Sequence, residues 1–304
     1  MRNLVIRTEN LTKEYGPQRG IDGLTLDVEP GEVFGFLGPE GSGKTTTIRL
    51  LLDFIKPTRG SASVLCLDSR RDAQAIRKRV GYSPAHFHLY EDRTAGQMLR
   101  LLAGLQGNVV WSEVDRLAER FHLDLDASIA LLSDCDRQKI GLVQALMHRP
   151  QLVILDEPTN RLDDITREAL YQMIAEIRAQ GQAVFWACDQ PGEVERLCDR
   201  VGVVRDGRLV AVERVVQFKT RSLRKVEIRF AGPVPAEPFQ HISNVKNLRM
   251  DHATLRCTIQ GEADALVKAA GQFRVMDMIS RESTLDEVFK TYEYPFLLGM
   301  AEAK

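Results

Sequence analysis

The sequence predicts an α/β fold built around a parallel sheet, followed by a smaller α+β domain. Over residues 1–213, apolar runs of strand length alternate with segments of helical spacing. A Gly-rich stretch at residues 38–46 separates one such run from a helix. The composition shifts after about residue 213, so we expect residues 214–304 to form a linker and a second domain.

Composition and charge narrow the class of protein. The chain has 304 residues, 44% of them hydrophobic, enough for two packed domains. A formal net charge of -1 gives no strong field for a nucleic-acid partner. No apolar run approaches the roughly 20 residues that span a bilayer, and the N-terminus has no signal-peptide core. Five cysteines without C-x-x-C spacing indicate free thiols in a reducing cytosol rather than a metal site.

The chain opens with a predicted pair of antiparallel strands, at residues 2–8 and 24–28, around the turn-rich segment 15–20. Tyr15 has two interpretations. It is a half-buried strand residue, or its ring stacks on a purine base. The sequence leaves both open.

Residues 38–46 fit the phosphate-binding pattern G-x-x-x-x-G-K-[ST]. A predicted strand at 32–37 precedes them and a predicted helix at 46–52 follows, as the phosphate-binding function requires. Glycines let the backbone N–H groups face phosphate oxygens, Lys44 reaches the terminal phosphates, and the Thr45 hydroxyl is placed for Mg²⁺. The predicted nucleotide-binding residues are Tyr15, Gly38, Glu40, Gly41, Ser42, Gly43, Lys44, Thr45 and Thr46.

The middle of the chain continues the alternation. We expect a strand, a short helix, a second strand and three helices, at residues 61–67, 72–79, 81–84, 94–106, 111–121 and 133–147. Ser133 is the predicted N-cap of the last helix. His86 and His88 alternate as metal ligands can, but no third ligand is evident, which favours a solvated loop.

A buried strand at residues 151–156 ends in two carboxylates. α/β folds bind ligands at the carboxyl ends of their strands. We therefore expect Asp156 to hold Mg²⁺ and Glu157 to orient or deprotonate the attacking water. The alternative is a strand-end turn with acidic decoration, but a phosphate-binding loop needs such an acidic partner.

The remaining elements complete both domains. We expect a helix at 164–179, a strand at 182–187 and a hairpin at 201–212, then a basic linker at Lys219, Arg221, Arg224 and Lys225. The second domain is expected to contain strands at 226–230, 245–250, 255–259 and 275–279 and helices at 263–273 and 284–292. It holds no evident catalytic cluster, so its expected role is contact.

These motifs identify a family resemblance. Residues 1–213 resemble the nucleotide-binding subunit of ABC transporters, through segments 38–46, 81–84, 132–133, 152–157, 159–163 and 193–201. The C-terminal extension is similar to that of bacterial exporter-type subunits with one cassette per chain. The resemblance implies a P-loop NTPase (RecA-like) cassette with antiparallel β and helical subdomains. In that family Tyr15 would stack on adenine.

The resemblance also implies partners and a location. Two cassettes of this family form a head-to-tail dimer around two ATP molecules, and Leu162 and Asp163 would touch the partner cassette. Integral membrane subunits would dock near the loop after Pro84. The chain would then be cytoplasmic and peripheral, on the inner face of the membrane, with ATP and Mg²⁺ as its ligands.

Three family motifs depart from the pattern. Ala85 replaces a Gln or Glu, Asp134-Cys135-Asp136 replaces the Gly-Gly-Gln of the signature, and Asp189 replaces a His that bonds the γ-phosphate. A carboxylate about 4–6 Å from a phosphate costs on the order of 1–4 kcal/mol. Alternatively, Asp134 and Asp136 only favour the first turn of a helix. We expect at most weak ATP hydrolysis, and the changed signature favours a different partner cassette over a homodimer.

Two functions from different classes follow. One is the ATP-binding subunit of a transporter, coupling ATP binding and slow hydrolysis to membrane transport. The other is a regulatory or scaffolding cassette that binds ATP without hydrolysing it and pairs with a competent cassette. A soluble translation or DNA-repair cassette is disfavoured by the single cassette, the lack of a long inserted arm and the lack of excess basic charge.

Overall fold

The computed structural model describes residues 3–16, 18–216, 224–259 and 262–282. The chain divides into two compact units, Met1–Glu213 and Arg214–Lys304. Each unit has its own apolar core. Within the described residues, no helix is both long and apolar enough to cross a membrane.

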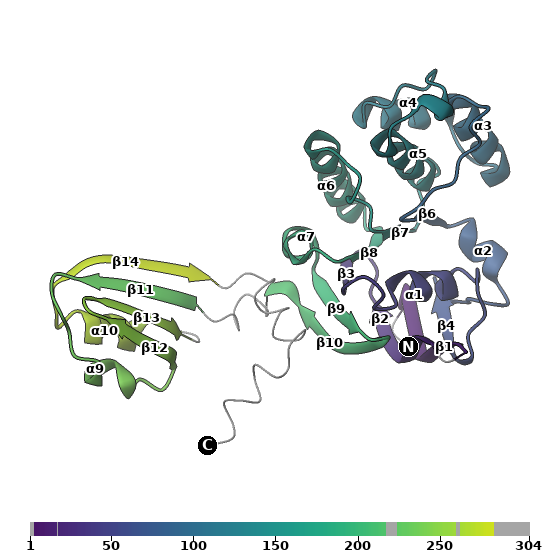
Figure 1. Cartoon of the computed structure of the whole chain (residues 1–304). Helices are drawn as coiled ribbons and strands as arrows, with labels where there is room; N and C mark the ends of the chain where they lie inside the picture. The colour runs from purple at the N-terminus through teal and green to yellow at the C-terminus, as the bar shows by residue number, and fades with distance from the viewer. Residues whose placement is uncertain (1–2, 17, 217–223, 260–261, 283–304) are drawn as a thin grey trace. The chain divides into compact units, whose positions relative to one another are not determined.

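A six-stranded sheet forms the centre of the first unit (Figure 1). Its order is β10-β9-β3-β8-β7-β6. The strands are β3 (Val33–Leu37), β6 (Val80–Ser83), β7 (Leu152–Asp156), β8 (Ala183–Cys188), β9 (Arg200–Arg205) and β10 (Arg208–Arg214). The pairs from β9 to β6 are parallel. Every residue of β3, β7 and β8 is buried, which confirms the burial predicted for β3 and β7 from their continuous apolar runs.

A second, antiparallel sheet has the order β2-β1-β4-β5. Its strands are β1 (Ile6–Tyr15), β2 (Gln18–Val28), β4 (Arg59–Val64) and β5 (Leu67–Asp68). One apolar core joins both sheets to α1 (Lys44–Leu51). The predicted single strand at 61–67 is wrong: Leu65 and Cys66 adopt positive φ angles of 52° and 62°, so the chain turns between β4 and β5.

Helices cover both faces of the six-stranded sheet, α1 on one face and α6 and α7 on the other (Figure 1). A separate group, α3 to α5, lies beyond β6 (Figure 1). The bounds are α2 (Ala73–Arg77), α3 (Ala95–Gln106), α4 (Trp111–Arg120), the 3₁₀ turn η1 (Ile129–Leu131), α5 (Asp134–Leu146), α6 (Asp164–Ala179) and α7 (Pro191–Leu197). Ser133 caps α5 as predicted, accepting a hydrogen bond from the Asp136 N–H. Helix α7 was not predicted.

The second unit has the connectivity β-α-β-β-α-β. Its elements are β11 (Arg224–Phe230), α9 (Glu237–Gln240), β12 (Val245–Asp251), β13 (Thr254–Ile259), α10 (Asp264–Ala270) and β14 (Val275–Glu282). The antiparallel order β12-β13-β11-β14 is that of a split βαβ fold. Arg224 and Lys225 lie in β11, so assigning them to a linker was wrong. Lys219, Arg221 and the predicted helix at 284–292 lie outside the described residues.

Candidate functional site

The loop between β3 and α1 is shaped by glycines. Gly43 is the N-cap of α1 and has φ 108°, a region that residues with a Cβ rarely adopt. A Cβ there would also lie 2.7 Å from the Gly20 carbonyl oxygen and from Ile21 Cγ2. Space and conformation therefore both require glycine at position 43. The free N–H groups of the first turn of α1 face the end of this loop.

Lys44 lies across the loop and is almost fully buried. Its Nζ donates to the carbonyl oxygens of Gly38 and Pro39, at 2.6 and 3.0 Å. The same nitrogen forms an ion pair with Glu157 Oε1 at 2.9 Å. The ion pair joins the phosphate-binding loop to the acidic end of β7. Thr45 and Asp156, which also meet there, lie 111 residues apart in the chain.

Thr45 and Asp156 meet at the carboxyl ends of the parallel strands. The Thr45 hydroxyl donates to Asp156 Oδ2 at 2.8 Å. Asp156 is 0% exposed, and its other oxygen, Oδ1, has no hydrogen-bond partner among the residues that the structure describes. Burial raises the pKa of Asp156, against the hydrogen bond from Thr45 and the charge of Lys44. A buried carboxylate oxygen without a partner beside a hydroxyl is a donor set that fits Mg²⁺.

Glu157 follows in a strained backbone conformation, with φ 49°. Besides Lys44 it contacts Asn160, whose Nδ2 donates to Glu157 Oε2 at 3.1 Å. Burial raises the pKa of the Glu157 carboxyl, Lys44 opposes this, and the Asp189 charge adds to it. A half-buried carboxylate with a raised pKa is suited to accept a proton from water.

These groups line one cleft of about 420 Å³. Its walls are formed by Glu40, Lys44, Thr45, Arg49, Tyr82, Pro84, Ala85, His86, Asp156, Glu157, Asn160, Arg161 and Asp189. The structure thus brings together five of the predicted site residues, and it places the departures at 85 and 189 in the same cleft. Arg49, Asn160 and Arg161 were not predicted to line it.

Tyr15 lies outside the cleft lining. It ends β1, is 44% exposed, and has Lys13 Nζ 5.3 Å from its ring centroid. Its ring and the Thr46 methyl group both lie beside Gly20, which places the tyrosine next to the start of α1. The ring is thus partly exposed and contacts neighbouring residues, and its contact with adenine stays a prediction.

His86 and Arg161 form a contact that connects two loops. Arg161 Nη2 lies 2.7 Å from His86 Nδ1, and Arg161 Nη1 lies 3.9 Å from Asp134 Oδ1. Because a guanidinium only donates, the imidazole nitrogen is the acceptor. The sequence shows that Arg161 lies in the turn after Glu157, but it does not show the direction of the Arg161 side chain.

The two aspartates of the changed signature differ in environment. Asp136 accepts from the Ser133 hydroxyl at 2.7 Å and pairs with Lys139 at 2.9 Å. It is thus satisfied within its own helix, which supports the helix-start interpretation for that residue. Asp134 is 75% exposed and approaches only Arg161 at ion-pair distance among the described residues. Of the two aspartates, Asp134 is therefore the one whose carboxylate is left facing solvent.

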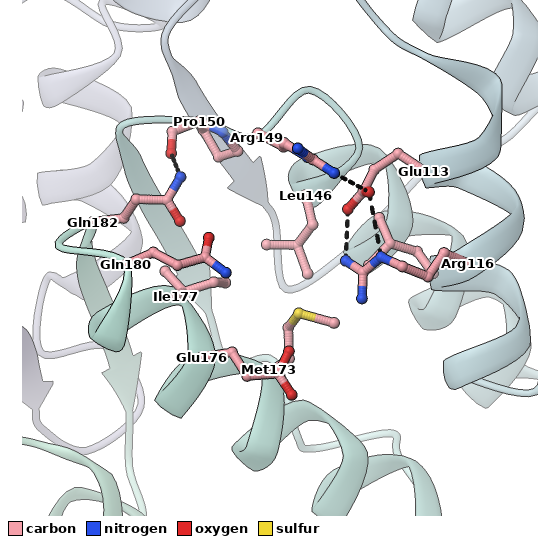
Figure 2. Close-up of a pocket in the computed structure, with 11 residues that line it drawn as sticks. Glu113, Arg116, Leu146, Arg149, Pro150, Met173, Glu176, Ile177, Gln180 and Gln182 are labelled. Carbon is pink, nitrogen blue, oxygen red and sulfur yellow. Dashed lines mark hydrogen bonds and ion pairs between the residues drawn. The ribbon is translucent and has the colours of Figure 1, made fainter.

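A second cavity of about 280 Å³ lies at the opposite edge of the sheet, where β7 and β8 begin (Figure 2). Figure 2 shows Glu113 between Arg116 and Arg149, and Gln182 bonded to the Pro150 carbonyl. The arginines lower the pKa of Glu113. The charges of Glu113 and its two arginines are thus already paired, so the cavity gives no sign of a reactive group.

Residues 21–160 match the ABC transporter family. The bacitracin transport ATP-binding protein BcrA of Bacillus licheniformis is 32% identical over 230 residues, covering 75% of each chain. The Nod factor export ATP-binding protein I of Paraburkholderia xenovorans is 29% identical over 295 residues, covering 95% of this chain and 97% of that protein.

Two solved structures have a similar fold. An ATP-binding subunit of an ABC transporter superposes with a TM-score of 0.66 at 28% identity, over 71% of this chain and 92% of that chain. A dimeric bacterial ABC transporter cassette has a TM-score of 0.64 at 22% identity, over 69% of this chain and 98% of that chain. The latter likeness shows the fold alone.

Proposed function

This chain belongs to the ABC transporter family, and on that premise we propose that it is the ATP-binding subunit of an ABC transporter. The observation that carries the proposal is the meeting of Lys44, Thr45, Asp156 and Glu157 at the carboxyl ends of β3 and β7. Binding of Mg-ATP there would be coupled to movement of a substrate across a membrane.

Each group of site residues is assigned a different part of the nucleotide. Backbone N–H groups between Glu40 and Thr46 would hold the phosphates, with Lys44 as their cation. Tyr15 would stack on the adenine ring. Thr45 and Asp156 would hold Mg²⁺, which supplies positive charge against the phosphate oxygens when bound.

Hydrolysis is proposed to be slow. Glu157 is placed as the base for an attacking water, and its raised pKa favours proton transfer. Ala85 has no group to orient that water, and Asp189 adds negative charge where the terminal phosphate would lie. The residues proposed to bind ATP are therefore all present. The family side chains that would orient the water at position 85 and bond the terminal phosphate at position 189 are missing.

The proposed partners are a second ATP-binding cassette and integral membrane subunits. The exposed Asp134 carboxylate would face the ATP of the partner cassette, which favours a heterodimer over two copies of this chain. The proposed location is the cytoplasmic face of the membrane.

One observation favours a second function. The charges of Asp134 and Asp189 oppose closure on ATP and its cleavage, so the chain would serve as a regulatory cassette that binds ATP without turnover. Detectable turnover above a Lys44→Ala control would exclude this second function.

Calorimetric titration of the full chain with Mg-ATP tests the proposal. We expect saturable binding that Lys44→Ala weakens by at least tenfold, because the lysine is the buried cation of the loop. Lys56→Ala is the matched control, since Lys56 pairs with Asp53 on the surface and should leave binding unchanged. Equal binding by all three proteins, or none by the unmodified chain, would refute the proposal.

A further inference from the structure

The cleft is lined by more carboxylates than permanent cations, and some of these charges are already paired with one another. Four carboxylates line it, from Glu40, Asp156, Glu157 and Asp189. Lys44 is engaged with Glu157 and two carbonyl groups, while Thr45 occupies one oxygen of Asp156. The remaining permanent cations of the lining are Arg49 and Arg161.

Arg161 is the cation of the cleft that lies in the same loop as Glu157. Its hydrogen-bond partner is the ring nitrogen His86 Nδ1, at 2.7 Å. Asp134, at 3.9 Å, lies beyond hydrogen-bond distance and is mostly in solvent. With 35% of its side chain exposed, Arg161 also remains open to the cleft.

The position of Arg161 places this cation beside the reacting end of the nucleotide. It follows Asn160, which bonds Glu157, so the loop that holds the proposed base also holds the arginine. Arg49 instead comes from α1, outside the loop that holds Glu157. The family residue that reaches Mg²⁺ or water at position 85 is here an alanine, and the one that bonds the γ-phosphate at position 189 is an aspartate.

We propose that Arg161 binds the terminal phosphate of ATP held in this chain's own cleft, in place of the contact that Asp189 cannot make. This inference rests on the proposed function. Arg161 uses one of its five N–H groups on His86, and its planar fork suits phosphate oxygens. His86 is a positioning residue that holds the guanidinium toward the cleft, and Asp134 competes for it.

Comparing ATP with ADP isolates the terminal phosphate. For the full chain with Mg²⁺, we expect Arg161→Ala to weaken ATP binding about tenfold and ADP binding less than twofold, because ADP lacks the contacted group. Arg161→Lys, which keeps the charge but not the fork, should fall between. Asp134→Asn, which removes the competing carboxylate, should tighten ATP binding severalfold without changing ADP binding.

Two variants serve as controls. Arg196→Ala removes an exposed arginine that pairs with Glu168, and it should change neither affinity. Arg49→Ala tests the other cation of the cleft and should not alter the ATP-to-ADP ratio. Equal losses for ATP and ADP in Arg161→Ala, or an unchanged ATP affinity, would overturn the inference while leaving ATP binding intact. Absence of nucleotide binding by the unmodified chain would overturn the proposed function as well.

Discussion

Replacing Asp156 with asparagine should stabilise the chain while abolishing its response to Mg-ATP. The carboxylate is 0% exposed, and its Oδ1 has no partner in the described part of the chain. A buried acceptor left unpaired costs about 1–3 kcal/mol, more if charged. The asparagine keeps the acceptor for Thr45 and loses the charge, so a gain of about 1–2 kcal/mol is expected, or roughly 2–8 °C for a unit of this size.

The pH dependence of this gain has a definite sign. Burial raises the pKa of Asp156 in the folded state, so the fold favours the protonated acid. The penalty is absent below the pKa of the unfolded chain and grows as the pH rises through the folded pKa. Asp156→Asn should therefore raise the melting temperature most near neutral pH and progressively less toward the acid side of the folded pKa.

Thermal unfolding with and without Mg-ATP measures both effects. Mg-ATP should raise the melting temperature of the unmodified chain and not that of Asp156→Asn, because the variant loses the metal-binding carboxylate. Asp164→Asn is the matched control: its side chain is 96% exposed, and its stability should change by less than about 0.5 kcal/mol. An Asp156→Asn protein that is less stable at neutral pH, or that still responds to Mg-ATP, would refute the reasoning.

Three further perturbations have clear expectations. Gly43→Ala should abolish nucleotide binding in titration calorimetry, since a methyl group at φ 108° would meet the Gly20 carbonyl at 2.7 Å; retained binding would contradict the account of the loop. Asp189→Asn should raise ATP turnover about tenfold or more by removing a like charge worth on the order of 1–4 kcal/mol; no gain in a phosphate-release assay would show that this charge does not limit turnover. Phe239→Ala, which empties part of the core beside Phe230 and Phe273, should destabilise the second unit by about 3–5 kcal/mol in denaturant melts; a parallel loss of Mg-ATP affinity would argue against separate units.

Residues whose role is fixed locally could be predicted from the sequence. The buried strands β3, β7 and β8 show as continuous apolar runs, and the α5 start shows as Ser133 at an N-cap. The phosphate loop is likewise local, because its glycines and Lys44 stand at fixed spacing. Thr45 and Asp156 were each assigned to Mg²⁺ from separate motifs, and the structure joins them at 2.8 Å.

Features that depend on tertiary contacts could not be predicted in this way. The turn at Leu65 and Cys66 lies within an apolar run, so nothing local interrupts the apparent strand. Arg161 and His86 lie 75 residues apart, and only the parallel neighbours β6 and β7 bring their loops together. Asp136 differs from Asp134 through Ser133 and Lys139, partners whose geometry depends on the helix having formed.

Steady-state ATP turnover of the purified full chain with Mg²⁺ tests the central claim most directly, that ATP binding is intact while hydrolysis is impaired. We expect saturable ATP binding with slow turnover, and we expect both Lys44→Ala and Glu157→Gln to abolish the turnover. Fast turnover that survives Glu157→Gln would contradict the assignment of the base and the effect of Ala85 and Asp189.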